Sequence, residues 1–102
     1  MNNSFYSTLG LAMRAGQISC GELATKELVA SGKAAFVLLD NSASKNKRDM
    51  MFNAGSYYHV PVIVLEEGVL GQAIGKPGLI SCAIPKGSFG KKLLELAQNN
   101  SI

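Results

Sequence analysis

Cysteine and histidine are scarce in this chain, and their scarcity excludes two classes of small protein. Two cysteines, Cys20 and Cys82, among 102 residues are too few for a fold held together by disulfides. In a reducing cytosol we expect both to be free thiols. The single histidine, His59, leaves no Cys/His cluster with zinc-binding spacing, so we expect no metal and no other cofactor.

Long apolar segments are absent as well. No run approaches the roughly 18–20 residues that a membrane-spanning helix needs. The first ten residues, MNNSFYSTLG, contain neither a basic segment nor a sustained apolar stretch, so no signal peptide is expected. These absences predict a cytoplasmic protein that has no membrane partner.

Known catalytic motifs are missing too. The chain has no Gly-x-Ser-x-Gly, no glycine-rich phosphate loop followed by Lys-Ser/Thr, and no paired carboxylates in an apolar context. A cysteine could in principle pair with His59 as a nucleophile, but a lone histidine before a strand is usually a surface residue. We therefore predict that the protein is not an enzyme.

The composition that remains is that of a globular protein. Hydrophobic residues make up 47% and charged residues 17% of the chain. This length suits one core, so we expect one domain over residues 1–102, and a monomer. A net charge of +3 and an isoelectric point near 9 permit a polyanionic partner without selecting one.

Helix and strand patterns alternate along the chain, which predicts an α/β fold: a three-layer α/β/α sandwich with a small mixed sheet. The strand over 34–39 has no polar member and should be central and buried on both faces. Capping residues and glycines predict five helices: from Ser4 to Gly16, from a Ser19–Glu22 capping box to about Ser31, roughly 43–58, 69–74, and from Ser88 onward. Extended segments are expected at 17–19, 34–39, 60–65 and 79–84. The inward residues should include Phe5, Leu9, Ala12, Met13, Met51, Ala54, Tyr58, Phe89, Leu93, Leu96 and Ala97, with Lys91 and Glu95 paired outside.

One end of this predicted sheet gathers basic side chains. Each helix returns antiparallel to the strand that follows it, so the start of the second helix should lie near the end of strand 34–39. The segment 40–48 begins at the same end, which brings Lys26, Lys45, Lys47 and Arg48 beside a helix N-terminus that suits phosphate. Glu66 and Glu67 should lie nearby and would oppose an anion. Taken singly, each lysine fits an ordinary solvated helix face better than a phosphate contact.

Five segments carry a family resemblance: LGLAMRAGQISCGE, SGKAAFVLL, YYHVPVIV, LGQAIGK and AIPKGSFGKKL. In order and in register they resemble the bacterial YlxQ-like branch of the L-seven-Ae/L-thirty-e ribosomal protein superfamily, over about residues 8–95. The LGxAIGK box after a VPV strand is the most specific of them. The resemblance implies a three-layer sandwich that recognises kink-turn or related internal-loop RNA, within or alongside ribosomal RNA.

The resemblance also implies an RNA face, built from the start of the second helix and the loop before the last strand. Gly21 matches the family glycine, whose missing side chain lets a phosphate approach the backbone, and Glu22 matches the acidic residue after it. Lys76 matches the lysine of the IGK box. Glu22 could equally serve in the capping box, and Ser81 and Cys82 could be ordinary strand residues. With the basic end, the predicted RNA-binding residues are Gly21, Glu22, Lys26, Lys45, Arg48, Lys76, Ile80, Ser81 and Cys82.

One departure from the family pattern concerns the second helix. In archaeal members the glycine is followed by Asn-Glu and, three residues after the Glu, by Lys. Counted back from Gly32 without a gap, these positions hold Leu23, Ala24 and Glu27. Lys26 then lies one residue early, a rotation of about 100° around the helix. A one-residue deletion would restore Lys26 to the lysine position and place Glu22 at the Asn position, and the residues alone leave both registers open.

Two functions of different kinds follow. The first is non-catalytic binding of structured RNA by a ribosome-associated protein. The alternative is a protein-interaction module on the same fold that has lost RNA binding, motivated by the displaced lysine and the modest charge. A gel shift against a kink-turn RNA separates them.

Overall fold

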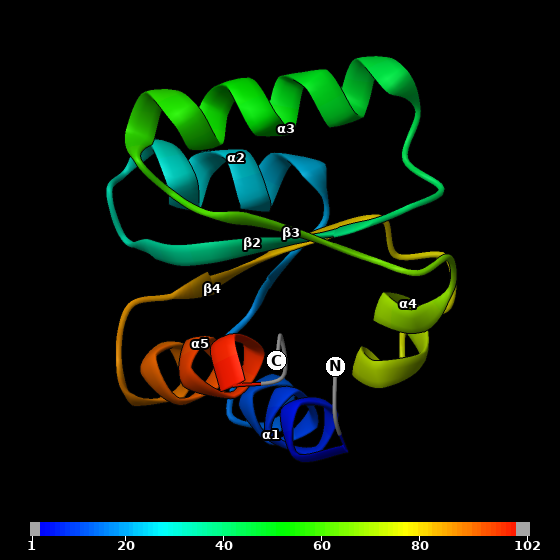
Figure 1. Ribbon diagram of the computed structural model, residues 1–102, viewed down its shortest axis with the longest axis vertical. Helices are drawn as coiled ribbons and strands as arrows, with labels where there is room; N and C mark the ends of the chain where they lie inside the picture. Colours follow the sequence, from blue (N-terminus) through cyan, green and yellow to red (C-terminus); the bar gives the residue numbers. More distant parts are fainter. Residues whose placement is uncertain (1–2, 100–102) are drawn as a thin grey trace.

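Helices and strands alternate along the whole described part of the chain, residues 3–99 of a computed structural model (Figure 1). Between residues 3 and 40 the elements are α1 (Asn3–Arg14), β1 (Ser19–Cys20), α2 (Glu22–Ala30) and β2 (Ala34–Asp40). They continue with α3 (Lys45–Tyr58), β3 (Val62–Leu65), α4 (Val69–Ile74), β4 (Ser81–Pro85) and α5 (Ser88–Asn99).

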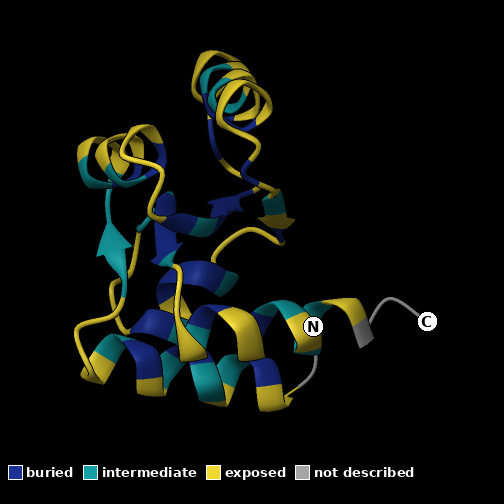
Figure 2. Ribbon diagram, turned by 90° about the vertical axis from the view of Figure 1, so that its left-hand side faces the viewer, coloured by how far each residue is buried: buried dark blue, intermediate teal, exposed yellow. Residues whose placement is uncertain are grey.

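The strands form a mixed sheet in the order β1-β4-β2-β3. β2 runs parallel to β3 and antiparallel to β4, and β1 is antiparallel to β4. Helices α2 and α3 cover one face, and α1, α4 and α5 cover the other (Figure 1). The predicted three-layer α/β/α sandwich with a mixed sheet is confirmed, and Figure 2 shows the buried sheet between its exposed helical layers.

Strand β2 is the centre of the core, as its unbroken apolar run predicts. Phe36 and Leu38 pack in one cluster with Phe5, Leu9 and residues of α4, β4 and α5. On the opposite face, Val37 packs beside Val29 of α2 in a second cluster. Burial on both faces requires a strand without polar side chains, and β2 keeps only Asp40, its last residue, as an exception.

Glycine signals located the helix ends correctly. Gly16 has φ 71°, and the N–H of Gln17 donates to the Ala12 carbonyl over 2.8 Å, which closes α1. Residues 31 and 32 end α2, and α4 spans the predicted residues. Within α3, Met51 faces inward as predicted, but Tyr58 is 40% exposed. Gly55 is buried instead. A Cβ at this position would lie 2.6 Å from the Val60 carbonyl oxygen, so the close packing here requires glycine.

The three predicted serine caps were wrong. Helix α1 already begins at Asn3, so Ser4 lies inside it. Ser19 is held extended by pairing with Ala83, so the Ser19–Glu22 capping box does not form, and Gly21 takes the cap position without a side-chain bond. Ser88 is the first residue of α5. The cap that the sequence interpretation missed is Ser44, whose side chain accepts a hydrogen bond from the Lys47 N–H over 3.2 Å.

Other boundaries move by one to three residues. Residues 60–61 and 79–80 lie outside strands β3 and β4, and the first extended piece is Ser19–Cys20 rather than 17–19. Lys91 and Glu95 form no ion pair in the described range, where the ion pairs join Lys45 to Asp49 and Lys47 to Glu22. None of the helices within residues 3–99 is both long and apolar enough to cross a bilayer.

Candidate nucleic-acid interface

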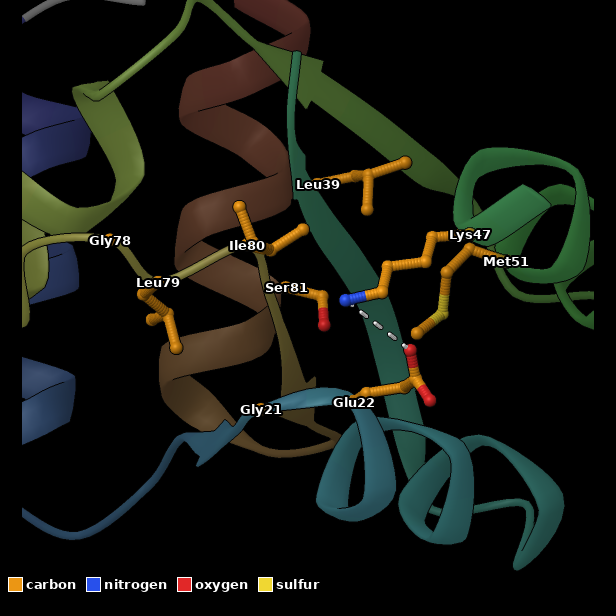
Figure 3. A pocket seen from close by; sticks show the side chains of 9 residues that line it. All are labelled: Gly21, Glu22, Leu39, Lys47, Met51, Gly78, Leu79, Ile80 and Ser81. Atoms are coloured by element: carbon orange, nitrogen blue, oxygen red, sulfur yellow. Dashed lines mark ion pairs between the residues drawn. The ribbon is translucent and has the colours of Figure 1, made fainter. Parts of the chain in front are cut away.

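A hollow lies where strand β2 ends and helix α2 begins. These segment ends lie toward the right-hand side of Figure 1. The volume of the hollow is about 230 Å³. The antiparallel return of α2 onto β2 predicted this meeting of segments. The lining residues, drawn in Figure 3, are Gly21, Glu22, Leu39, Lys47, Met51, Gly78, Leu79, Ile80 and Ser81.

Gly21 connects the two sides of the hollow through its backbone. Its N–H donates to the Ser81 carbonyl over 2.9 Å, which ties the start of α2 to the start of β4. Its φ of 94° and ψ of 164° lie in a region that is essentially restricted to glycine. No heavy atom would lie within 4 Å of a Cβ at this position, so the backbone here faces open space. The conformation and the open approach both depend on glycine.

The first turn of α2 borders the hollow and has no side-chain cap. The N–H groups of residues 22–24 have no acceptor within the helix, and the positive end of the helix dipole is located here. Such a helix start favours an anion, and backbone amides can bind a phosphate without a cationic side chain. Glu22, which also lines the hollow, places a carboxylate beside them.

Lys47 of α3 reaches across the hollow toward Glu22 (Figure 3). Its Nζ lies 3.9 Å from Glu22 Oε1, and the two side chains are 51% and 46% exposed. An ion pair this long and this exposed contributes little to stability. Lys47 is therefore available to exchange the carboxylate for a phosphate oxygen at small cost.

The floor of the hollow is apolar. Leu39 and Met51 are buried and belong to the core cluster on the α3 side of the sheet, against which Ile80 also packs. Met51 is thus a core residue, as the sequence predicted, with one side turned to the hollow. Ser81, at the edge of the hollow, is 2% exposed. An apolar floor with polar groups at the mouth suits the flat face and polar edge of a nucleobase.

A second hollow adjoins the first along residues 78–80 and has acidic walls that include Asp40 and Glu67. Asp40 is 2% exposed and accepts hydrogen bonds from the Gly68 N–H over 2.8 Å, from the Ser42 N–H over 3.0 Å and from the Ser42 hydroxyl. Burial raises the pKa of Asp40, but these three bonds outweigh burial, and the net effect lowers that pKa. A charged carboxylate is therefore built into the end of the sheet.

Of the two glutamates predicted near this end, Glu67 lines the acidic hollow, whereas Glu66 lines a separate hollow with Tyr6. Burial, and secondly the charge of Glu66, raise the pKa of Tyr6.

The predicted basic residues differ in whether they already have a hydrogen-bond or ion-pair partner. Lys45 pairs with Asp49 over 2.9 Å, and Arg48 donates to the Asn41 carbonyl over 2.8 Å and to its side chain over 3.0 Å. Both lie at the predicted end but have partners within α3 or the loop before it. Lys76 is exposed at the start of the loop that supplies Gly78, Leu79 and Ile80.

Helix geometry places Lys26 with respect to the hollow. Lys26 is exposed in the second turn of α2, four residues after Glu22 and on the same face of the helix. Glu27 lies on another flank, where it borders a groove with Ala24, Leu28 and Lys33. The side of α2 that carries Glu22 toward the hollow therefore also carries Lys26.

Cys82 is the residue that was wrongly placed in the interface. Its side chain is 0% exposed in the core cluster, because alternation along β4 turns it to the face covered by α1, α4 and α5. It therefore cannot contact RNA. Cys82 lies opposite Cys20 in the β1–β4 register, and both are free cysteines.

Five lining residues were absent from the predicted set. Leu39 and Met51 were expected only in the core, Lys47 was assigned to this end but not included among the binding residues, and Gly78 and Leu79 were not singled out. The Pro77-Gly78 pair is a turn signal that could have located them. In the described part of the chain, no three His, Cys, Asp or Glu side chains gather to hold a metal ion.

Comparisons with known proteins identify relatives of this chain. No family model matches the chain. An RNA-binding protein YlxQ of Enterococcus faecium is 38% identical over 91 residues, which cover 88% of this chain and 87% of that protein. An RNA-binding protein YlxQ of Bacillus subtilis (strain 168) is 33% identical over 93 residues, covering 90% and 93%. A solved structure of a protein with unknown function from Bacillus halodurans C superimposes with a TM-score of 0.86 at 30% identity, covering 95% of this chain and 99% of that one.

Proposed function

The chain belongs to the YlxQ family, and from this premise we propose that it binds structured RNA, with the hollow between α2, α3 and β4 as the binding site. The proposed RNA is a kink-turn or a related internal loop, in which an unstacked base can leave the helix. The protein residues that we propose to contact this RNA are Gly21, Glu22, Lys26, Lys47, Lys76, Ile80 and Ser81.

The observation that supports this site best is the open backbone at Gly21 beside an apolar hollow. A phosphate can approach the amides that begin α2, since no side chain occupies the space at Gly21. The adjacent hollow of about 230 Å³ is smaller than the roughly 300–1,000 Å³ pockets that enclose drug-sized ligands. It suits one base, while Glu22 and Lys47 offer an acceptor and a donor at its edge.

We propose a non-catalytic role, in which affinity and shape recognition are the whole activity. A cytoplasmic monomer of one domain, associated with the ribosome, fits this role. The ribosomal superfamily that the sequence resembles supports the association, and the exposed, half-open site fits an RNA better than an enclosed small substrate.

The test is a gel shift at fixed salt with two matched RNAs. One carries a kink-turn with its sheared G·A pairs, and the other replaces these pairs with Watson–Crick pairs. We expect binding of the first and at least tenfold weaker binding of the second. Equal affinity for the two RNAs would contradict recognition of the kink.

One observation favours the alternative function, a protein-interaction module. Carboxylates are as numerous as cations around the hollow, and two of the predicted cations already have partners. If the protein binds neither RNA at physiological salt, the interaction module replaces RNA binding as the proposed function.

A further inference from the structure

The positive charge of the protein does not lie at the proposed RNA site. The loops, the end of β2 and the first five residues of the helices around the two hollows carry five cations and five carboxylates. These are Lys26, Lys45, Lys47, Arg48 and Lys76, against Glu22, Asp40, Asp49, Glu66 and Glu67. The formal charge of +3 must therefore come from elsewhere on the surface.

It comes from the opposite end of the sheet, the left-hand end of Figure 1, where α2 leads into β2, α3 into β3 and β4 into α5. The residues of these connections and residues 88–92 of α5 include four lysines and no carboxylate, while Glu27, in the last turn of α2, borders a groove with Lys33. We call this the lysine end, and its cations are Lys33, Lys86, Lys91 and Lys92. All four are exposed.

Backbone contacts bring these segments together. The N–H of Lys86 donates to the Lys33 carbonyl over 2.8 Å, so the two lysines lie side by side on neighbouring segments. Lys91 N–H bonds to the Gly87 carbonyl, which keeps the first turn of α5 next to Lys86. The C-terminal end of α3 lies at this same end of the sheet, above the connection from α2 to β2 (Figure 1).

Two exposed tyrosines lie at the same end of the sheet as these lysines. Tyr57 is 77% and Tyr58 is 40% exposed, and both lie in the last turn of α3, next to His59. Their rings are 4.7 Å apart in an edge-to-face arrangement. Lysines follow a phosphate backbone, and exposed aromatic rings stack on unpaired bases, which is the combination that single-stranded nucleic acid binders use.

We propose that the lysine end is a second, separate RNA-binding surface that takes single-stranded RNA without sequence preference. Lys33 and Lys86 contact the phosphates, and Tyr57 stacks on a base. This surface does not depend on the hollow at the other end, and it requires no kink in the RNA. It lets the protein hold an unpaired strand in addition to a structured element.

The experiment measures the binding of the full chain to a labelled 12-nucleotide oligouridine by fluorescence anisotropy at low salt. Lys33→Glu and Lys86→Glu should each weaken binding about tenfold, and the double variant should lose it. The backbone bond between the two residues survives these changes because only side chains are altered. In each single variant, the slope of log affinity against log salt should be shallower than in the wild type by about 0.7, the value for one single-strand phosphate contact.

Arg14→Glu is the matched control, since it makes the same change of net charge at an exposed residue outside both ends. It should weaken oligouridine binding less than twofold. Tyr57→Ala should weaken binding several-fold, and Tyr57→Phe should restore it, because stacking needs the ring and not the hydroxyl.

Three outcomes would overturn the proposal: no oligouridine binding by the wild type, equal effects of Arg14→Glu and Lys33→Glu, or loss of oligouridine binding in Gly21→Ala. The first two deny a localised surface, and the third assigns the binding to the hollow. None of them affects the kink-turn test, in which the lysine-end variants should discriminate the two RNAs as the wild type does.

Discussion

Asp40 and Gly68 are 28 residues apart in the sequence, yet the Asp40 carboxylate accepts the Gly68 N–H over 2.8 Å. The bond joins the end of β2 to the turn before α4, and the same carboxylate holds Ser42 at the start of the next loop. Three of the segments around the two hollows are thus positioned by one buried charge.

Replacing this charge should destabilise the protein in a pH-dependent way. Asp40→Asn should lower the free energy of unfolding at pH 7 by about 1–3 kcal/mol, the usual cost of disturbing hydrogen bonds to a buried charged group. Because the folded-state pKa is lowered, the stabilisation is present above the unfolded pKa of about 3.9 and is lost as pH falls through the folded value. Urea unfolding at pH 7 and pH 3 should therefore show the two proteins converging in acid. Asp49→Asn, at an exposed ion pair, is the control and should change stability by less than about 1 kcal/mol at either pH.

Gly21→Ala should separate strain from binding. The positive φ makes any side chain costly, by about 1–2 kcal/mol of stability, and the added methyl group would narrow the phosphate approach. Gly16→Ala also places a side chain at a positive φ, 71°, but lies at the end of α1. Both variants should melt earlier, and only Gly21→Ala should lose affinity for the kink-turn RNA. Equal affinity losses would mean that strain alone explains the effect.

The two possible registers of α2 can be separated by a pair of substitutions. Lys26 shares the helix face of Glu22, so Lys26→Ala should weaken kink-turn binding by about 1–3 kcal/mol, as for a lost charge-assisted hydrogen bond. Glu27→Lys should add only a general charge effect, since Glu27 lies on another flank. The reverse pattern, a silent Lys26→Ala and a strongly improved Glu27→Lys, would establish the ungapped register. If neither substitution changes the affinity, the start of α2 does not bind RNA.

The salt dependence of kink-turn binding should be shallow. With Lys45 and Arg48 engaged by Asp49 and Asn41, about three phosphate contacts remain for the lysines near the hollow. At about 0.7–0.9 per contact, log affinity should fall against log salt with a slope near −2 to −3. A minimal RNA without single-stranded flanks keeps the lysine end out of this measurement. A slope steeper than about −5 would indicate a basic surface beyond these residues.

The two thiols should react at very different rates. Burial, and secondly the nearby Cys20, raise the pKa of the Cys82 thiol far above its usual range, whereas Cys20 is only partly buried. A thiol reagent should label one cysteine in the native protein and two after denaturation under non-reducing conditions. Mass spectrometry should assign the native label to Cys20. Finding no free thiol in freshly prepared protein would contradict the expected reduced state.

Local pattern determined much of this protein. The apolar side chains of β2 leave water only when both faces of the strand are buried, which makes it a central strand. Glycines can end α1, α2 and α4 because they adopt φ angles that other residues avoid. The alternation of elements then required the start of α2 to meet the end of β2, which assigned a helix start and basic side chains to this end of the sheet. The family resemblance added Gly21 and the 80–81 segment to the same place.

Tertiary structure decided what depends on partners distant in sequence. Whether Ser19 caps a helix or extends a strand was settled by its pairing with Ala83, and a local motif contains no information about that pairing. Arg48 and Lys47 are neighbours with similar charges, but one is bound to Asn41 and the other reaches Glu22, because a rotation of 100° per residue separates their directions. The position of the net charge followed from the same cause. Each lysine is visible in the sequence, but only the packing of strands and helices assigns it to one end of the sheet or to the other.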